Sequence, residues 1–170
     1  MPTVSNVPSA RPADFFGRLL GLFHGLNAAM DALQPAAALL ARGYVAEAFF
    51  KSGLTKLRDW DITLALFQDE YKVPLLPPEV AAVMGTCGEL VLPVLLLLGL
   101  GGRFAALGLS VVNVVAVISL TEIAPAALQQ HVTWGVLLAG AAVFGSGRWA
   151  LDTWLMQRWF GHLAKRGDHL

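Results

Sequence analysis

Charged side chains are scarce in this sequence. Asp, Glu, Lys and Arg make up 14% of the 170 residues, whereas a soluble domain carries about 25%. Hydrophobic residues reach 56%, so too few charges remain to cover a surface in water. This composition argues against a disordered chain, a coiled coil and an ordinary cytosolic enzyme. The 12 basic residues are balanced by 12 acidic ones, so the chain lacks the basic excess that nucleic-acid binding needs.

Cysteine and histidine are also few. The single cysteine, Cys87, excludes an internal disulfide, a CxxC redox pair and a thiolate metal cage. We expect its thiol to be buried in apolar surroundings and inert. No pair of histidines lies within the apolar stretches described below, so we expect no intrinsic haem, iron–sulfur or other metal site. Redox chemistry in this chain would therefore need a bound quinone or a partner protein.

Long apolar runs are what the sequence has in abundance. Four of them approach the roughly 20 residues that a helix needs to cross a bilayer, namely 35–57, 79–98, 104–120 and 127–144. They are continuously apolar rather than alternating, which predicts helices and not barrel strands. The predicted fold class is all-α, an integral membrane four-helix bundle with flanking amphipathic interfacial helices. The short Gly-rich turn at 98–103 makes the second and third helices antiparallel neighbours.

The segments around these runs predict further helices. Residues 13–34 carry apolar side chains at spacings of three and four, which predicts an amphipathic helix in the membrane interface, with a fifth span as the alternative. The same segment has glycines at a spacing that permits close helix contact: Gly17, Gly21 and Gly25. Residues 62–71 predict a short interfacial helix. The predicted layout is a flexible lead at 1–12, the amphipathic helix at 13–34, the four-helix domain at 35–146 and an aromatic amphipathic helix and tail at 147–170.

Lysine and arginine predict the orientation, because cytoplasmic loops carry an excess of both. With the N-terminus in the cytoplasm, eight basic residues lie inside: Arg11, Arg18, Arg42, Arg103, Arg148, Arg158, Lys165 and Arg166. Four lie outside: Lys51, Lys56, Arg58 and Lys72. This distribution favours cytoplasmic N- and C-termini and an external loop at 58–78.

Several polar side chains fall inside the predicted spans, where a charge costs about 2.5–3.5 kcal/mol. Glu47 and Lys51 share a helix face at i, i+4, and Glu89 and Asn113 lie midway along the second and third spans. We expect these residues to converge on one polar layer inside the bundle. Pro93 frees the backbone carbonyl of Glu89, so Lys51, Asn113, water or a ligand must satisfy Glu89. The layer is then either a structural ion pair that fixes helix register or a proton, quinone or ligand site.

Polar residues also lie on a second face of the first predicted helix and near the outer end of the fourth. Arg42, Gly53 and Lys56 fall on a different face of the first helix from Glu47, and Lys56 is expected to reach lipid headgroups. His131 precedes Trp134 near the outer end of the fourth helix. There it either binds a quinone carbonyl or a weakly held metal, or it caps a helix or faces water. No catalytic residue is assigned. The candidate ligand or proton site consists of Glu47, Lys51, Glu89, Asn113 and His131.

Three segments carry motifs in a fixed order. FFKSGLTKLRDW ends the first span, GELVLPVLLLLGLGGR lies in the second, and FGSGRWALD follows the fourth. Together they resemble the DoxX family of small bacterial membrane proteins over residues 39–152. The positions that match the family pattern are Arg42, Gly53, Lys56, Leu57, Glu89, Gly99, Leu100, Arg103, Gly145, Gly147, Leu151 and Asp152. Pro93 departs from the pattern, because family members often have Gly in that region.

The resemblance implies a multi-pass protein of the bacterial inner membrane. Some relatives are small subunits of quinone-linked thiosulfate oxidation, and others are tied to oxidative stress or metal handling. The implied function is a membrane subunit of such a system, accessory to a quinone-linked oxidoreductase, with quinone as candidate ligand and a redox or metal-handling partner. The alternative is a non-catalytic scaffold that anchors a soluble partner. A transporter fits less well, because a four-helix unit lacks the inverted repeat that a homo-oligomer would supply.

Overall fold

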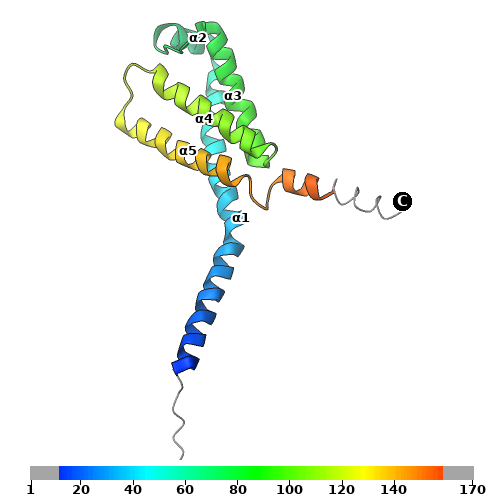
Figure 1. The fold of residues 1–170 in the computed structure, drawn as a ribbon. Coiled ribbons are helices and arrows are strands. Elements are labelled where there is room, and N and C mark those ends of the chain that lie inside the picture. The colour runs from blue at the N-terminus through cyan, green and yellow to red at the C-terminus, as the bar shows by residue number, and fades with distance from the viewer. Residues whose placement is uncertain (1–11, 159–170) are drawn as a thin grey trace, which may run out of the picture. The chain divides into compact units, whose positions relative to one another are not determined.

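The computed structural model describes residues 12–158, with side chains from Phe16 onward. These residues form helices and contain no strand, so the all-α prediction is confirmed (Figure 1). The main helices are α1 (Pro12–Arg58), α2 (Trp60–Asp69), α3 (Pro78–Leu98), α4 (Gly102–Ser119) and α5 (Pro125–Phe144). Residues 151–158 are also helical. The predicted lead before residue 12 and the predicted tail after residue 158 lie outside the described residues.

Helix α1 is longer than the sequence predicted. We expected one helix over 13–34 and another from 35, but α1 runs without a break through Pro35. The contacts nevertheless divide the chain into two units, Met1–Gln34 and Pro35–Leu170. In the first unit, every described side chain from Phe16 to Gln34 is exposed, and an added Cβ at Gly17, Gly21 or Gly25 would meet no atom within 4 Å.

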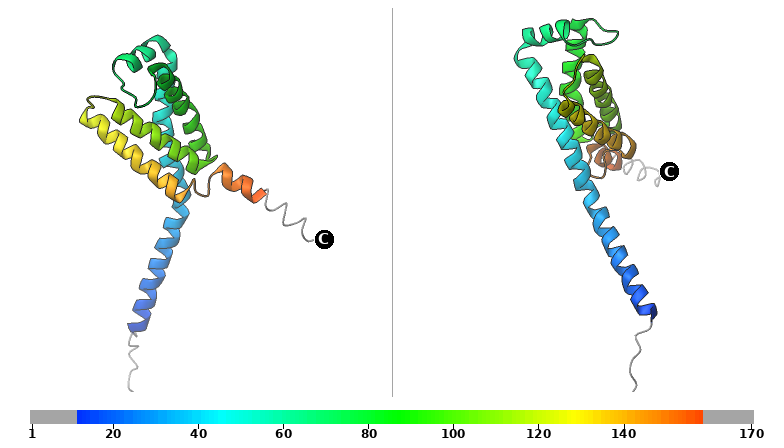
Figure 2. Two further views of the ribbon diagram at one scale, coloured as in Figure 1. Left: turned by 45° about the horizontal axis from the view of Figure 1, so that its top comes forward. Right: turned by 90° about the vertical axis from the view of Figure 1, so that its left-hand side faces the viewer.

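The second unit follows the predicted order of helices. The ends of α3, α4 and α5 fall within two residues of the predicted spans. Pro78 and Pro125 stand at the first turns of α3 and α5, where the missing N–H costs nothing. Gly99 ends α3 in the left-handed conformation, with φ of 69°. The turn that follows makes α3 and α4 antiparallel, as predicted, and α4 lies beside α5 in each view (Figures 1 and 2).

The short helix predicted in the 58–78 connection is also present. Helix α2 begins after Asp59, whose carboxylate accepts a hydrogen bond from the Ile62 amide at 3.1 Å. This is an ordinary N-cap. Phe67 on α2 packs against Ala81 and Ala82 at the start of α3.

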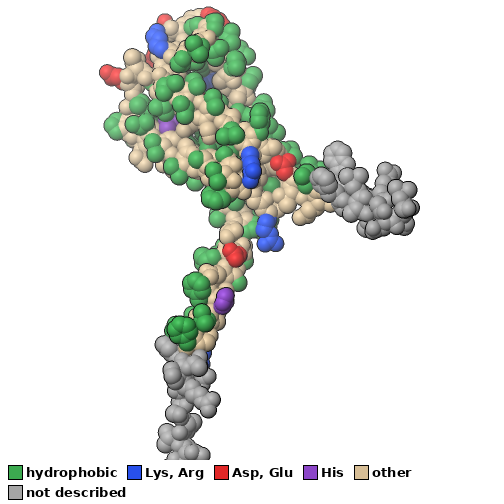
Figure 3. Space-filling model, viewed as in Figure 1, with side chains coloured by type: hydrophobic (Ala, Val, Ile, Leu, Met, Phe, Trp, Pro, Cys, Tyr) green, Lys and Arg blue, Asp and Glu red, His purple; other side chains and the backbone are tan. Residues whose placement is uncertain are grey.

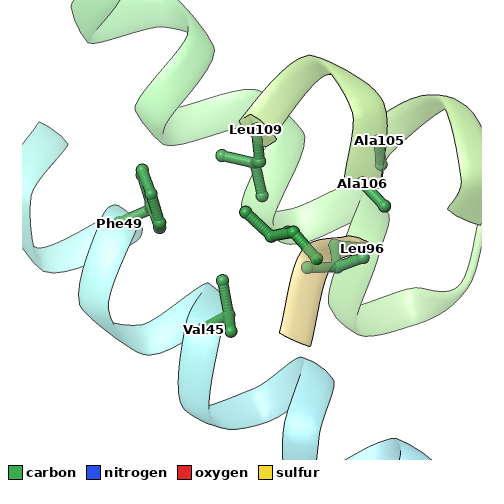
Figure 4. Packing of buried hydrophobic residues seen from close by; sticks show 7 residues of the cluster. Val45, Phe49, Leu96, Ala105, Ala106 and Leu109 are labelled. Carbon is green, nitrogen blue, oxygen red and sulfur yellow. The ribbon is translucent and has the colours of Figure 1, made fainter. Parts of the chain in front are cut away.

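The core lies where α1, α3, α4 and α5 meet. Val45 and Phe49 of α1 face Leu96 of α3 and Leu109 of α4 (Figure 4), and Leu138 of α5 completes the cluster. Ala105 and Ala106 contribute almost no side-chain bulk and have 0% exposure. Small residues of this kind allow close backbone approach, which is how helices associate in a lipid environment.

Large apolar side chains cover the outside as well. Phe104, Val111, Val136 and Phe144 are each more than half exposed, and hydrophobic side chains are spread over the visible surface (Figure 3). Two helices, α3 and α4, are long and apolar enough to cross a membrane. A surface of this character is suited to lipid rather than to water.

Candidate functional site

A cavity of about 380 Å³ opens between α1, α2, α3, α4 and α5. Its walls are mainly apolar and include Phe49, Met84, Val111 and Leu120. A small number of polar side chains interrupt these walls: Ser52, Lys56, Tyr71, Glu89, Ser119 and His131. Apolar walls with a few convergent polar groups are typical of a small-molecule site.

The main charged feature of this cavity is an ion pair between α1 and α3. Lys56 Nζ lies 2.6 Å from Glu89 Oε2, and the two side chains are only 19% and 10% exposed. The same ammonium donates a hydrogen bond to Ser52 Oγ at 2.9 Å. Lys56 therefore binds Glu89 rather than lipid headgroups, which corrects the sequence prediction for this residue.

Gly53 explains how the two helices come close enough for this pair. A Cβ at Gly53 would lie 2.9 Å from Leu90 Cγ and 3.1 Å from Glu89 Cβ. Since Lys56 follows Gly53 by three residues, it lies on the same face of α1 and reaches Glu89. The G-x-x-K spacing therefore combines a close helix contact with a cation.

Glu47 and Lys51 form a separate pair on the outside of α1. Their charged atoms are 2.6 Å apart, and their side chains are 63% and 72% exposed. The i, i+4 pairing was predicted correctly, but neither residue lines the cavity, so their expected convergence with Glu89 is wrong. The proximity of the Lys51 ammonium lowers the cost of carrying Glu47 on an outward face.

Asn113 and His131 meet between α4 and α5. Asn113 Nδ2 donates to the backbone carbonyl of His131 at 2.9 Å, and Asn113 Oδ1 lies 2.8 Å from His131 Nδ1. A carbonyl only accepts, so the amide nitrogen must face it, and the amide oxygen must face the ring. Nδ1 therefore carries a hydrogen, which leaves Nε2 of the neutral imidazole as an acceptor.

Aromatic rings hold this histidine in place. Trp134 lies edge-on to His131 with ring centroids 5.0 Å apart, and Phe49 lies 5.5 Å from Trp134. The Trp134 indole N–H is buried and has no hydrogen-bond partner within the described chain. An unmet buried donor costs about 1–3 kcal/mol, so a ligand oxygen at this end of the cavity would be favoured.

Tyr71 closes another side of the cavity, just after α2. Its ring lies 5.0 Å from that of Phe67, and the neighbouring Lys72 amide donates to the Ser119 carbonyl at 2.8 Å. Burial raises the pKa of the Tyr71 hydroxyl, and the negative charges of Glu70 and Glu89 raise it further. Tyr71 is therefore a neutral hydrogen-bonding group at ordinary pH.

The position of Cys87 differs from the prediction. It is exposed on α3, whereas we expected a buried thiol. It points away from the protein interior, while the neighbouring Thr86 and Glu89 are buried.

A second polar cluster joins α1 to the chain around the α3–α4 turn. Arg42 is 3% exposed and donates to the carbonyls of Leu96 and Leu97, each at 3.4 Å, and of Trp149 at 2.7 Å. A Cβ at Gly99 would lie 2.6 Å from Arg42 Nη1. The Gly102 amide donates to Asp152 Oδ2 at 3.3 Å. These hydrogen bonds hold the ends of helices together.

Comparison with protein-family models shows the family of the chain. A family model described as DoxX matches residues 37–122. The chain belongs to the DoxX family. No curated protein and no solved structure matches the chain.

The DoxX match covers α1 from residue 37, α2, α3 and α4. It therefore contains Arg42, Gly53, Lys56 and Glu89, the residues that form both interhelical ties of α1. His131 and the closing positions Gly145, Gly147 and Asp152 follow the matched region. In the structure Gly145 and Gly147 both have positive φ, 80° and 75°, which explains glycine at these two positions.

Some residues of the site were not predicted from the sequence. Ser52, Tyr71 and Trp134 were not singled out as site residues, although all three line the cavity. For Ser52 a signal existed, because it lies four residues before Lys56 and so shares its helix face. Nothing in the sequence places Tyr71 against the cavity, because that depends on how α2 folds back on α3.

Proposed function

We propose that this DoxX protein is a multi-pass subunit of a redox system in the bacterial inner membrane and that it binds a quinone-type molecule. In this proposal α3, α4, α5 and residues 35–57 of α1 cross the membrane. Helices α3 and α4 meet the length and composition that a span requires. The other two carry more polar residues. Arg42 in α1 is buried and His131 in α5 is half-buried, whereas Glu47 and Lys51 in α1 are exposed and pair with each other.

The observation that carries the proposal is the composition of the cavity wall. Small-molecule sites occupy roughly 300–1,000 Å³, and this cavity measures about 380 Å³. Aromatic and aliphatic walls suit a flat ring, and the Glu89–Lys56 pair and His131 supply polar groups for its oxygens. Bringing the ionisable pair inside the bundle is costly, which favours a functional role for it.

The binding test begins with protein purified in mild detergent. The total of quinone and quinol extracted from the wild type is compared with the total from Glu89→Gln and His131→Ala. Glu47→Gln serves as the control, because it removes a carboxylate on the same bundle but outside the cavity. We expect co-purified quinone in the wild type and the control and at least a tenfold loss in both cavity variants. Equal quinone content in all four proteins, or none in any, would contradict the proposal.

The proposed orientation has its own measurement. With Cys87→Ser as background, since Cys87 is exposed, single cysteines replace Asp69 and Lys165. A membrane-impermeant thiol reagent added to intact cells should label position 69 and leave position 165 unlabelled until the membrane is opened. The reverse pattern would overturn cytoplasmic termini.

A scaffold that anchors a soluble partner is the second candidate function. One observation favours it: Leu75, in the loop between α2 and α3, is fully exposed and has φ of 66°. A non-glycine residue in this conformation is strained, and a leucine side chain in water gains nothing. Under the scaffold hypothesis Leu75→Ser abolishes capture of a redox or metal-handling protein, while quinone content does not change.

A further inference from the structure

Two acceptor atoms of the cavity residues have no donor within the described chain. The first is His131 Nε2. Asn113 accepts from Nδ1–H on the opposite side of the ring, and His131 lines the cavity whereas Asn113 does not. The hydrogen bonds of the Asn113 amide therefore fix the tautomer that leaves Nε2 an acceptor.

The second acceptor belongs to Glu89. Lys56 binds Oε2, and no hydrogen bond to Oε1 is made by residues 12–158. The Lys56 ammonium also donates to Ser52, so two of its three hydrogens are already committed. The polar part of the cavity wall thus contains a free carboxylate oxygen and a free imidazole nitrogen.

Acceptors require donors from the ligand. A quinone ring carries carbonyl oxygens, which only accept, whereas the corresponding quinol carries two O–H groups, which donate. A carbonyl facing Nε2 would leave both atoms unpaired in an apolar cavity. From this, and resting on the proposed quinone-type ligand, we infer that the cavity selects the reduced quinol over the quinone.

Tyr71 does not reverse this preference. Its hydroxyl both donates and accepts, so it pairs with either form of the ligand. The buried Trp134 indole N–H only donates, and it also pairs with either form, because the oxygen of a quinol hydroxyl accepts as well as donates. Discrimination therefore depends on His131 and Glu89. Asn113 acts as a positioning residue, because it determines which nitrogen of His131 carries the hydrogen.

The test compares binding of decylubiquinol, decylubiquinone and the dimethyl ether of the quinol to the full chain in mild detergent. The ether keeps the ring and both oxygens but has no O–H group. Measurements are made without oxygen at about pH 8, where an ordinary imidazole is neutral. Partition of each ligand into detergent is the same for every variant, so the ratio of affinities is compared between proteins.

For the wild type we expect the quinol to bind about a hundredfold more tightly than the quinone or the ether, as for two hydrogen bonds worth about tenfold each. His131→Phe keeps the aromatic contact with Trp134 but removes one of the two acceptors, so the ratio should fall about tenfold, and Glu89 should retain the remainder. His24→Phe is the matched control, since His24 is exposed and lies in the unit before Pro35; its ratio should equal that of the wild type. Asn113→Asp favours the imidazolium, whose Nε2–H donates, so the preference should move toward the quinone.

Each outcome has one reading. Equal affinities in the wild type, or tighter binding of quinone, would overturn the inference and leave the proposed quinone site standing. Failure of all three ligands to bind would remove both. A ratio that is the same in His131→Phe as in the wild type would overturn the assignment to His131.

Discussion

Replacing Lys56 by methionine is the most direct test of the tie between α1 and α3. The substitution keeps the length of the side chain but leaves the Glu89 carboxylate, only 10% exposed, without its cation. At 2.6 Å the Coulomb energy is about 6 kcal/mol for an effective dielectric of about 20, and desolvation of both ions offsets part of it. Breaking a buried pair from one side costs about 3–5 kcal/mol. We expect the lower end, because the adjoining cavity can supply water to the remaining charge.

The assay is the free energy of unfolding in mixed micelles, measured by denaturant titration. Lys51→Met is the matched control, because it removes a lysine from an i, i+4 pair on the same helix whose side chains are exposed; its effect should be much smaller. The double variant Lys56→Met/Glu89→Leu should recover most of the loss, since replacing both ions by apolar groups is often neutral. Equal destabilisation by Lys56→Met and Lys51→Met, or a double variant no more stable than Lys56→Met alone, would show that the Lys56–Glu89 pair is not a buried, mutually dependent ion pair.

Three further predictions concern backbone geometry and pH. Gly99→Ala should lower the free energy of unfolding by about 2–4 kcal/mol, because φ is 69° and the new Cβ would lie 2.6 Å from both Ala150 Cβ and Arg42 Nη1. Gly101→Ala is the control, because its φ is 54° but no atom lies nearer than 4.0 Å. It should lower the same free energy by about 1 kcal/mol. Gly53→Ala should force α1 and α3 apart and cost about 1–3 kcal/mol, whereas Gly43→Ala, with its nearest neighbour at 3.9 Å, should be neutral or stabilising. The pKa of Tyr71 is higher in the folded state than in the unfolded state. The contribution of Tyr71 to the free energy of unfolding should therefore be complete below about pH 10, the pKa of an unfolded tyrosine. It should be lost as the pH rises through the pKa of the folded state. Tyr71→Phe should abolish this decline. Tyr44→Phe retains Tyr71 as the one tyrosine, and its tyrosinate absorbance should appear above about pH 10.

The helices were predictable because long apolar runs have one stable form in lipid. The starts of α3 and α5 follow from Pro78 and Pro125, and the end of α3 from Gly99. The continuity of α1 was not predictable from Pro35. A proline removes one hydrogen bond and disfavours a helix interior, and only the packing around it decides whether the helix continues.

The partner of Glu89 was predicted wrongly for a specific reason. Helix periodicity assigns residues to faces but does not say which face meets the protein. The first span carries two polar stripes, one with Glu47 and Lys51 and the other with Gly53 and Lys56. Gly53 was the usable signal, because a residue without Cβ permits the closest approach of a second helix. The same limit applies to Cys87: beyond Glu79 in its first turn, α3 is apolar on every side except at Thr86 and Glu89, so its sequence gives little basis for orienting the thiol.

Two polar contacts join α1 to the rest of the bundle. We expect the Arg42 hydrogen bonds to contribute to stability alone, whereas the Lys56–Glu89 pair also lines the cavity. Substitution of Arg42 tests this distinction. Its guanidinium is 3% exposed and donates to carbonyls at the last turn of α3, where the helix dipole favours a cation. Arg42→Leu would leave these carbonyls and that of Trp149 without their donor, which should cost about 3–5 kcal/mol in the unfolding titration. Since Arg42 does not line the cavity that holds Glu89 and His131, the ratio of quinol to quinone affinity should remain that of the wild type. A changed ratio in a variant of undiminished stability would show that the Arg42 cluster and the Lys56–Glu89 pair are not independent.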